Sequence, residues 1–95
     1  MNPPRVCIVG NGGWGTALGL LLRSHGAAVT LWGPFEEDLR DIRAAGENRK
    51  FLPGVPLPAD LRWTSDPAEA ARDADLVVLA TPSHFFPEVC ERFRQ

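Results

Sequence analysis

The sequence of 95 residues predicts an α/β fold in which helices cover both faces of a doubly wound parallel sheet. Three observations lead to this prediction. Short apolar runs rich in β-branched residues alternate with longer stretches whose apolar residues recur at helical spacing. The runs lack the polar alternation of half-exposed strands, which is typical of strands buried on both faces of a parallel sheet. A glycine cluster, GNGGWG at residues 10–15, separates the first apolar run from the first helical stretch.

Four segments are predicted to form strands. Each is short and bounded by glycine, proline or polar residues. In chain order they span residues 5–10 (RVCIVG), 27–32 (AAVTLW), 61–65 (LRWTS) and 75–83 (DLVVLATPS). Because helical or extended connections separate them, we expect parallel strands joined by right-handed crossovers.

Four further segments are predicted to form helices. They span residues 14–24, residues 33–48, a segment that begins at Asp66-Pro67, and residues 86–95. Gly26 and Gly46 are placed to end the first two helices. Asp66 and Glu69 have the spacing of a capping box at the start of the third. Residues 48–60 contain three prolines and are expected to form an irregular connection.

The number of predicted strands has a consequence for the extent of the domain. A nucleotide-binding sheet of this type has about six strands in the order 3-2-1-4-5-6, whereas this chain ends after the fourth. The VVL run at 77–79 would then form a bare apolar sheet edge, which native proteins avoid. We therefore expect residues 1–95 to be the front part of a longer protein or an excised domain, truncated before the later strands.

Composition narrows the class of protein. The apolar fraction of 44% is that of a soluble globular domain, and the net charge of -2 gives no basic footprint for nucleic acid. No apolar stretch approaches the roughly 20 residues that span a bilayer. The N-terminus lacks the pattern of a signal peptide. Cys7 and Cys90 lie far apart, and a buried reduced thiol at Cys7 is favoured over a disulfide or metal pair, so we expect a cytoplasmic protein.

Gly10, Gly12 and Gly15 satisfy the pattern G-x-G-x-x-G. Alone, the pattern also fits an ordinary tight turn. Here it follows a buried strand and opens a helix, with a second strand soon after, which is the context of a dinucleotide-binding, Rossmann-like fold. In that interpretation Gly10 permits the turn, Gly12 clears the approach of a pyrophosphate, and Gly15 lets the helix pack closely. The lack of G-K-[ST] excludes a P-loop NTPase.

The sequence leaves the choice between NAD and NADP open. An Asp or Glu about 20 residues after the glycines normally holds the adenosine ribose and selects NAD. The second strand instead ends Leu31-Trp32-Gly33-Pro34, with neither an acid nor a cation at its tip. The acids at 36–38 come slightly late, and the interpretation that they serve the helix dipole is favoured.

A set of motifs resembles a known family. GNGGWGTAL, the LW that closes the second strand, N-x-x-F-L-P-G-x-x-L-P at 48–58, and ADLVVLATPSHFF together resemble the N-terminal domain of NAD(P)-dependent glycerol-3-phosphate dehydrogenase. The resemblance runs from Val6 to Val89. It implies that residues 1–95 are the N-terminal Rossmann domain or a fragment of it, without the C-terminal substrate and catalytic domain.

The resemblance also implies a reaction. Family members interconvert dihydroxyacetone phosphate and sn-glycerol 3-phosphate by hydride transfer with NAD(P)H, which supplies a glycerolipid precursor. Their catalytic and substrate-binding lysines correspond to positions beyond Gln95, so no catalytic residue is placed in this chain and we expect it to be inactive alone. The implied partners are these small-molecule substrates in the full-length enzyme, and a homodimer is compatible with the resemblance. Neither nucleic acid nor a membrane is implied.

Cofactor-binding residues follow from the resemblance position by position. They are Gly10, Asn11, Gly12, Gly13, Trp14 and Gly15 around the pyrophosphate, Phe35 near the adenosine, and Pro82 and Phe85 toward the nicotinamide. Pro34 stands where bacterial members often carry Arg or His, which favours NAD or dual use over NADP. No metal ligands are predicted, because Asp73 and Asp75 have no His or Cys neighbours.

Two alternative functions remain. The chain could be a stand-alone dinucleotide-binding or regulatory module without catalysis, or part of a ketopantoate or 6-phosphogluconate type dehydrogenase. The N-x-x-F-L-P-G stretch argues against the latter. For Asn48 within it, two roles stay open, one at the active-site cleft and one as a buried hydrogen-bonding residue that pins the loop.

Overall fold

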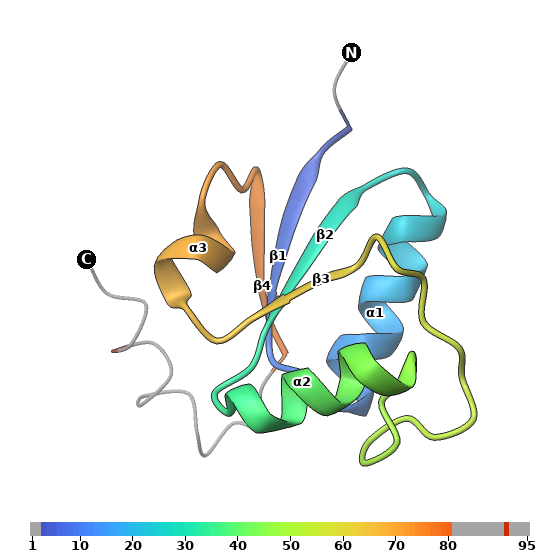
Figure 1. The fold of residues 1–95 in the computed structure, drawn as a ribbon. Helices are drawn as coiled ribbons and strands as arrows, with labels where there is room; N and C mark the ends of the chain where they lie inside the picture. The colour runs from blue at the N-terminus through green and yellow to red at the C-terminus, as the bar shows by residue number, and fades with distance from the viewer. Residues whose placement is uncertain (1–2, 81–90, 92–95) are drawn as a thin grey trace.

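The computed structural model describes residues 3–80 and Glu91. The strands within this part of the chain form one sheet. Its strands are β1 (Arg5–Val9), β2 (Ala28–Trp32), β3 (Arg62–Thr64) and β4 (Leu76–Leu79). All of their pairings are parallel, in the order β3-β2-β1-β4. The predicted parallel α/β sheet with strand order 3-2-1-4 is therefore confirmed (Figure 1).

Helices cover both faces of this sheet. They are α1 (Gly13–Ser24), α2 (Glu36–Ala45) and α3 (Pro67–Ala71). Figure 1 shows α1 and α2 on one side of the strands and α3 on the other, which is the doubly wound arrangement. The predicted helix at 86–95 lies outside the described residues except at Glu91.

Alternation along β1 builds a core on each face. Val6 and Ile8 belong to the cluster under α1, whereas Cys7 and Val9 belong to the cluster that contains Ala70 of α3. All four β1 residues are at most 6% exposed. The buried free thiol expected at Cys7 is confirmed, and burial raises its pKa to about 11.

The observed helix ends agree with most of the predictions made from the sequence. Gly46 adopts a left-handed conformation with φ of +69° and ends α2, as predicted. At α3 the Asp66 side chain accepts a hydrogen bond from the Ala68 N–H at 3.0 Å, so Asp66 is the cap. The expected capping box is wrong in its second half. Glu69 accepts from the Thr64 hydroxyl instead of reaching back to the Asp66 N–H, which itself donates to Thr64.

Strand β4 is shorter than predicted and is exposed. It ends at Leu79, although the Ala80 N–H still donates to the Val9 carbonyl at 2.9 Å. Leu76, Val77 and Leu79 are 53%, 47% and 44% exposed. The apolar edge expected at this strand is thus present among the described residues. Across residues 3–80 and Glu91, no helix is long and apolar enough to cross a membrane.

Candidate functional site

The chain turns sharply where β1 ends. Gly10 has a φ of +134°, a conformation that side chains disfavour, and its N–H donates to the Trp32 carbonyl at 2.8 Å. This bond ties the turn to the carboxyl end of β2. The turn leads directly into α1, so the helix begins at the carboxyl edge of the sheet (Figure 1).

Within the described residues, the first turn of α1 has no side-chain cap. Gly12 is the N-cap residue and has no side chain to accept a hydrogen bond, and the turn contains no acid. The first helical bond runs from the Thr16 N–H to the Gly12 carbonyl at 2.9 Å. The N–H groups of residues 13–15 therefore point out of the helix start, where the positive end of the helix dipole favours an anion.

The glycines of this loop are required for different reasons. A Cβ on Gly15 would lie 2.7 Å from the Gly10 carbonyl oxygen, so Gly15 permits the close packing of helix and turn. A Cβ on Gly13 would lie 2.6 Å from the carbonyl oxygen of Phe51. At Gly12, by contrast, nothing lies within 4 Å of an added Cβ, and its φ of -71° suits any residue. Packing within the described chain thus explains Gly13 and Gly15 but not Gly12.

Asn48 fixes the 48–52 segment to the glycine loop. Its side chain is buried, and its Nδ2 donates to the Asn11 carbonyl at 2.7 Å and to the Thr16 hydroxyl at 3.0 Å. Its Oδ1 accepts from the Phe51 N–H at 3.3 Å. Of the two roles left open by the sequence, the structure shows the buried hydrogen-bonding one.

Asn11 and Gly33 bring the two loops at this edge together. Asn11 is 8% exposed, and a Cβ on Gly33 would lie 2.9 Å from its side-chain Cγ. The Gly33 N–H donates to the Thr64 carbonyl at 3.1 Å. Among the predicted site residues, Asn11 is therefore a packing residue between β1 and β2, with its carbonyl held by Asn48.

The acid closest to the tip of β2 is already engaged. The Glu36 carboxylate accepts from Arg43 at 2.6 Å and from the Ser65 hydroxyl at 2.9 Å. The hydrogen bond from Arg43, followed by that from Ser65, lowers the pKa of Glu36. Asp38 lies 3.8 Å from the Lys50 amine. The tip itself thus presents Gly33 and exposed Phe35.

Aromatic side chains stand out from the site. Trp14 is 70% exposed, Phe35 65% and Phe51 44%. Trp14 and Phe35 were predicted from the resemblance, whereas the contact of Phe51 with Gly13 was not. The N-x-x-F spacing was the only signal that could have indicated it. Pro82 and Phe85, the remaining predicted site residues, lie outside the described residues.

The chemistry available in the loop is binding without proton transfer. Residues 10–16 contain no carboxylate, imidazole, amine or thiol. Within the described part of the chain, no group of three His, Cys, Asp or Glu side chains could hold a metal ion. The arrangement can hold an anionic group by backbone N–H donors at a helix start.

The sequence is similar to that of a known protein family. The family described as NAD-dependent glycerol-3-phosphate dehydrogenase N-terminus matches residues 5–95. A glycerol-3-phosphate dehydrogenase (NAD(P)+) of Syntrophomonas wolfei is 46% identical over 91 residues, which cover 96% of this chain and 26% of the relative. The corresponding protein of Thermus thermophilus is 49% identical over 79 residues, 83% of this chain and 24% of its own length.

A solved structure has the same fold. The crystal structure of glycerol-3-phosphate dehydrogenase from Coxiella burnetii aligns with a TM-score of 0.87 at 32% identity, covering 95% of this chain and 28% of that one. The chain spans about a quarter of the length of the curated relatives it matches.

Proposed function

Because this chain belongs to the NAD-dependent glycerol-3-phosphate dehydrogenase family, matching its N-terminal region, we propose that it holds the cofactor of an enzyme that interconverts dihydroxyacetone phosphate and sn-glycerol 3-phosphate. The reaction transfers a hydride between the nicotinamide and the C2 carbonyl of the substrate. Its product is a precursor of glycerolipids.

Gly12 is the observation that carries the proposal. It lies at the N-cap of α1, where its missing side chain is required neither by its φ of -71° nor by any described atom within 4 Å. A pyrophosphate that approaches the backbone at this point gives the missing side chain a reason. The N–H groups of residues 13–15 and the uncapped dipole of α1 suit the same anion. The residues present therefore fit a dinucleotide.

Other residues take roles around the diphosphate. Exposed Phe35, at the start of α2, is assigned to the adenosine side of the cofactor. Pro82 and Phe85 remain predictions for the nicotinamide side. Asn48 does not touch the cofactor in this proposal, since it is a positioning residue that holds the Asn11 carbonyl and Thr16.

We propose that the site accepts both NAD and NADP. Glu36, the nearest acid, is bound by Arg43 and Ser65 and is not free to select the ribose hydroxyl. Gly33 and Pro34 at the tip of β2 offer no cation to a 2′-phosphate. With neither selective group at the tip, we expect similar affinities for the two dinucleotides.

The wider assignments follow from the same family. We propose that residues 1–95 act as one cofactor-binding domain, and that the substrate contacts and the general acid belong to parts of the enzyme outside them. A cytoplasmic location agrees with the buried free thiol of Cys7.

The test is calorimetric titration of the 95-residue chain with NADH and NADPH. Gly12→Ala should lower the melting temperature only slightly, because the added methyl meets no described protein atom and alanine is merely a poorer N-cap residue than glycine. It should weaken the binding of both dinucleotides at least about tenfold, because the methyl occupies the approach of the pyrophosphate. Gly19→Ala in the same helix is the matched control, since a Cβ there would make only ordinary contacts, with the side chains of Ile8 and Leu31 at 3.4–3.5 Å.

Two outcomes would contradict the proposal. One is dinucleotide affinity in Gly12→Ala equal to that of the wild type. The other is turnover of dihydroxyacetone phosphate by the 95-residue chain alone, which would place catalytic groups where none are assigned. In the enzyme that carries this chain, the same substitution should raise KM for the cofactor in the reduction of dihydroxyacetone phosphate.

A further inference from the structure

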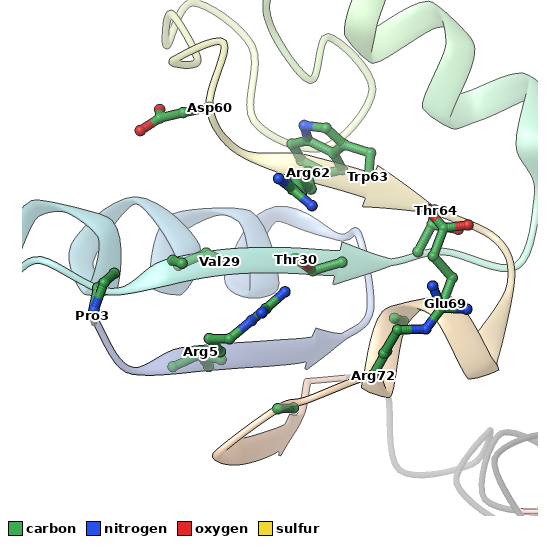
Figure 2. A pocket seen from close by; sticks show the side chains of 14 residues that line it. Pro3, Arg5, Val29, Thr30, Asp60, Arg62, Trp63, Thr64, Glu69 and Arg72 are labelled. Atoms are coloured by element: carbon green, nitrogen blue, oxygen red, sulfur yellow. The ribbon is translucent and has the colours of Figure 1, made fainter. Parts of the chain in front are cut away.

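A cavity of about 570 Å³ lies on the sheet face that carries α3, away from the glycine loop. Arg5, the first residue of β1, and Arg62, the first residue of β3, both line it. The end of the cavity that holds these two arginines is therefore at the amino-terminal edge of the strands, although Thr64 at the end of β3 also lines the cavity. The glycine loop is at the carboxyl edge. Along the strands the two edges are roughly 15 Å apart. Figure 2 shows the side chains of this cavity.

Strand register places two arginines on one side of the sheet. Thr30 is paired with Arg62 and with Cys7, and Arg5 is two residues before Cys7 on β1. Because paired residues share a face and side chains alternate with period two, Arg5, Thr30 and Arg62 face the same way. Figure 2 shows Arg5 and Arg62 extending into the cavity from either side of Thr30.

The spacing of these residues suits a small ligand. Two strand spacings and two residues along the strand separate the Cα atoms of Arg5 and Arg62 by roughly 12 Å. Extended arginine side chains from both sides can then reach one group that lies over β2. Ala28, paired with Arg5, adds only a methyl to the floor between them.

The cavity lining contains hydrogen-bond donors without partners among the described residues, whereas its two acidic side chains have partners. Among the described residues the guanidinium groups of Arg62 and Arg72 make no ion pair or hydrogen bond, and neither does the Thr30 hydroxyl. The Arg5 guanidinium has a single 3.9 Å contact among the described residues, with Asp73, and both side chains are at least half exposed. The Arg5 N–H donates to the Asp75 carboxylate at 2.8 Å. The acids in the lining have partners, Asp60 with Arg23 at 2.6 Å and Glu69 with the Thr64 hydroxyl at 3.3 Å.

We propose that this cavity is a second anion site, which binds a phosphate group between the guanidinium groups of Arg5 and Arg62, with the Thr30 hydroxyl donating from the floor. Arg72, the C-cap residue of α3, contributes positive charge at the far end of the cavity. Guanidinium forks donate in pairs to phosphate oxygens, and donors from three directions suit a tetrahedral anion better than a planar carboxylate. The phosphate is either free or carried on a larger ligand.

The experiment follows amide NMR shifts of the full chain during titration with inorganic phosphate, at constant ionic strength and with NADH present to fill the glycine loop. Phosphate should shift the amides of Thr30 and Arg62. Arg62→Gln should weaken phosphate binding by about tenfold, and adding Arg5→Gln should abolish it. Arg40→Gln removes the same charge from α2, outside the cavity, and should have no effect.

Arg62→Lys separates the contribution of the paired guanidinium donors from that of the positive charge. It also provides a second, more conservative variant in case Arg62→Gln does not fold. It keeps the positive charge but loses the paired donors, so its phosphate affinity should fall between those of wild type and Arg62→Gln. A phosphomonoester such as glycerol 2-phosphate, titrated in parallel, distinguishes free phosphate from a phosphate on a larger ligand by which of the two binds more tightly.

The proposal is overturned if phosphate shifts only residues 10–16, or if Arg40→Gln and Arg62→Gln weaken binding equally. It is also overturned if neither phosphate nor the monoester binds. NADH affinity should be unchanged in Arg62→Gln. This result keeps failure of the second site distinct from failure of the proposed dinucleotide site.

Discussion

Helices α1 and α2 both begin at the carboxyl edge of the sheet, one after β1 and the other after β2. Their first turns differ in charge. The first turn of α1 has no acid and no side-chain cap. That of α2 carries Glu36, Glu37 and Asp38. The short α3 resembles α2 in this respect, because the Asp66 side chain caps it. Carboxylates offset the positive end of the helix dipole in α2 and α3, whereas no carboxylate does so in the first turn of α1.

This difference shows how a binding function can be recognised from what a helix start lacks. All three helices face the same electrostatic requirement at their first turn. Two of them meet it with their own side chains. Helix α1 does not: Asn48 and Phe51 contact its start from another segment, and glycine occupies its N-cap and first position. The substitutions below either remove such contacts or make the two kinds of helix start alike.

The largest effect on stability is expected at Gly15. Gly15→Ala places a methyl 2.7 Å from the Gly10 carbonyl oxygen, so α1 must move away from the turn. We expect a loss of about 3 kcal/mol in the free energy of unfolding, measured by urea denaturation. Gly19→Ala in the same helix is the control. A loss below about 1 kcal/mol would mean that α1 does not need its close approach to the turn.

Asn48→Ala should have the next largest effect. It removes the donor to the Asn11 carbonyl and the Thr16 hydroxyl, both in buried surroundings. We expect a loss of about 2 kcal/mol in the free energy of unfolding, with weaker NADH binding in calorimetry. Asn48→Asp, similar in shape, should not rescue either property, since a carboxylate cannot donate. Rescue by Asp would show that these hydrogen bonds are not what holds the loop.

Gly12→Asp gives α1 the kind of residue that α2 already has. An aspartate at the N-cap should raise the free energy of unfolding by up to about 1 kcal/mol. The same carboxylate should abolish NADH binding, because it occupies and repels the pyrophosphate position. Gly12→Asn is the uncharged control, and the difference in affinity between the two variants reports the charge. Retained NADH affinity in Gly12→Asp would remove the basis for distinguishing α1 from α2.

The smallest effect is expected at Glu36, whose carboxylate is at the surface. Its pKa is lowered from 4.5 by hydrogen bonds from Arg43 and Ser65. A lowered folded-state pKa stabilises the fold above the unfolded value and ceases to do so as the pH falls through the folded value. The melting temperature of Glu36→Gln should therefore lie slightly below wild type near neutral pH, and the two should converge in acid.

Glu37→Gln serves as the control for this comparison, because it leaves the contacts of Arg43 and Ser65 with Glu36 in place. Melting curves of all three proteins across the acid range provide the measurement. A constant gap between Glu36→Gln and wild type at every pH would show that the Glu36 charge is not involved.

Much of the fold follows from local patterns along the chain. The β-branched run from Val6 to Val9 predicts a strand buried on both faces, and the structure has one. Gly10 and Gly46 predict a turn and a helix end, and both have positive φ. These features depend on near neighbours in sequence, which is why pattern and propensity suffice for them.

The details that failed or were missed depend on contacts between different segments of the folded chain. Gly13 belongs to the fingerprint region, but its need for a missing side chain comes from the carbonyl of Phe51, far along the chain. Glu69 has the right spacing for a capping box, yet its carboxylate accepts a hydrogen bond from the Thr64 hydroxyl of β3 instead. The site assignments of Pro82 and Phe85 stay predictions.

The exposure of Trp14 has a consequence for the fluorescence of the protein. Its indole is 70% exposed at the glycine loop, whereas that of Trp32 is fully buried and donates to the Ser65 carbonyl at 3.0 Å. An exposed indole emits at longer wavelength and is quenched by dissolved acrylamide, and a buried one is shielded. Emission from this protein therefore combines these two extremes with the signal of half-buried Trp63. Arrival of a nucleotide should change the red-shifted, quenchable component, and unfolding should release the shielded one.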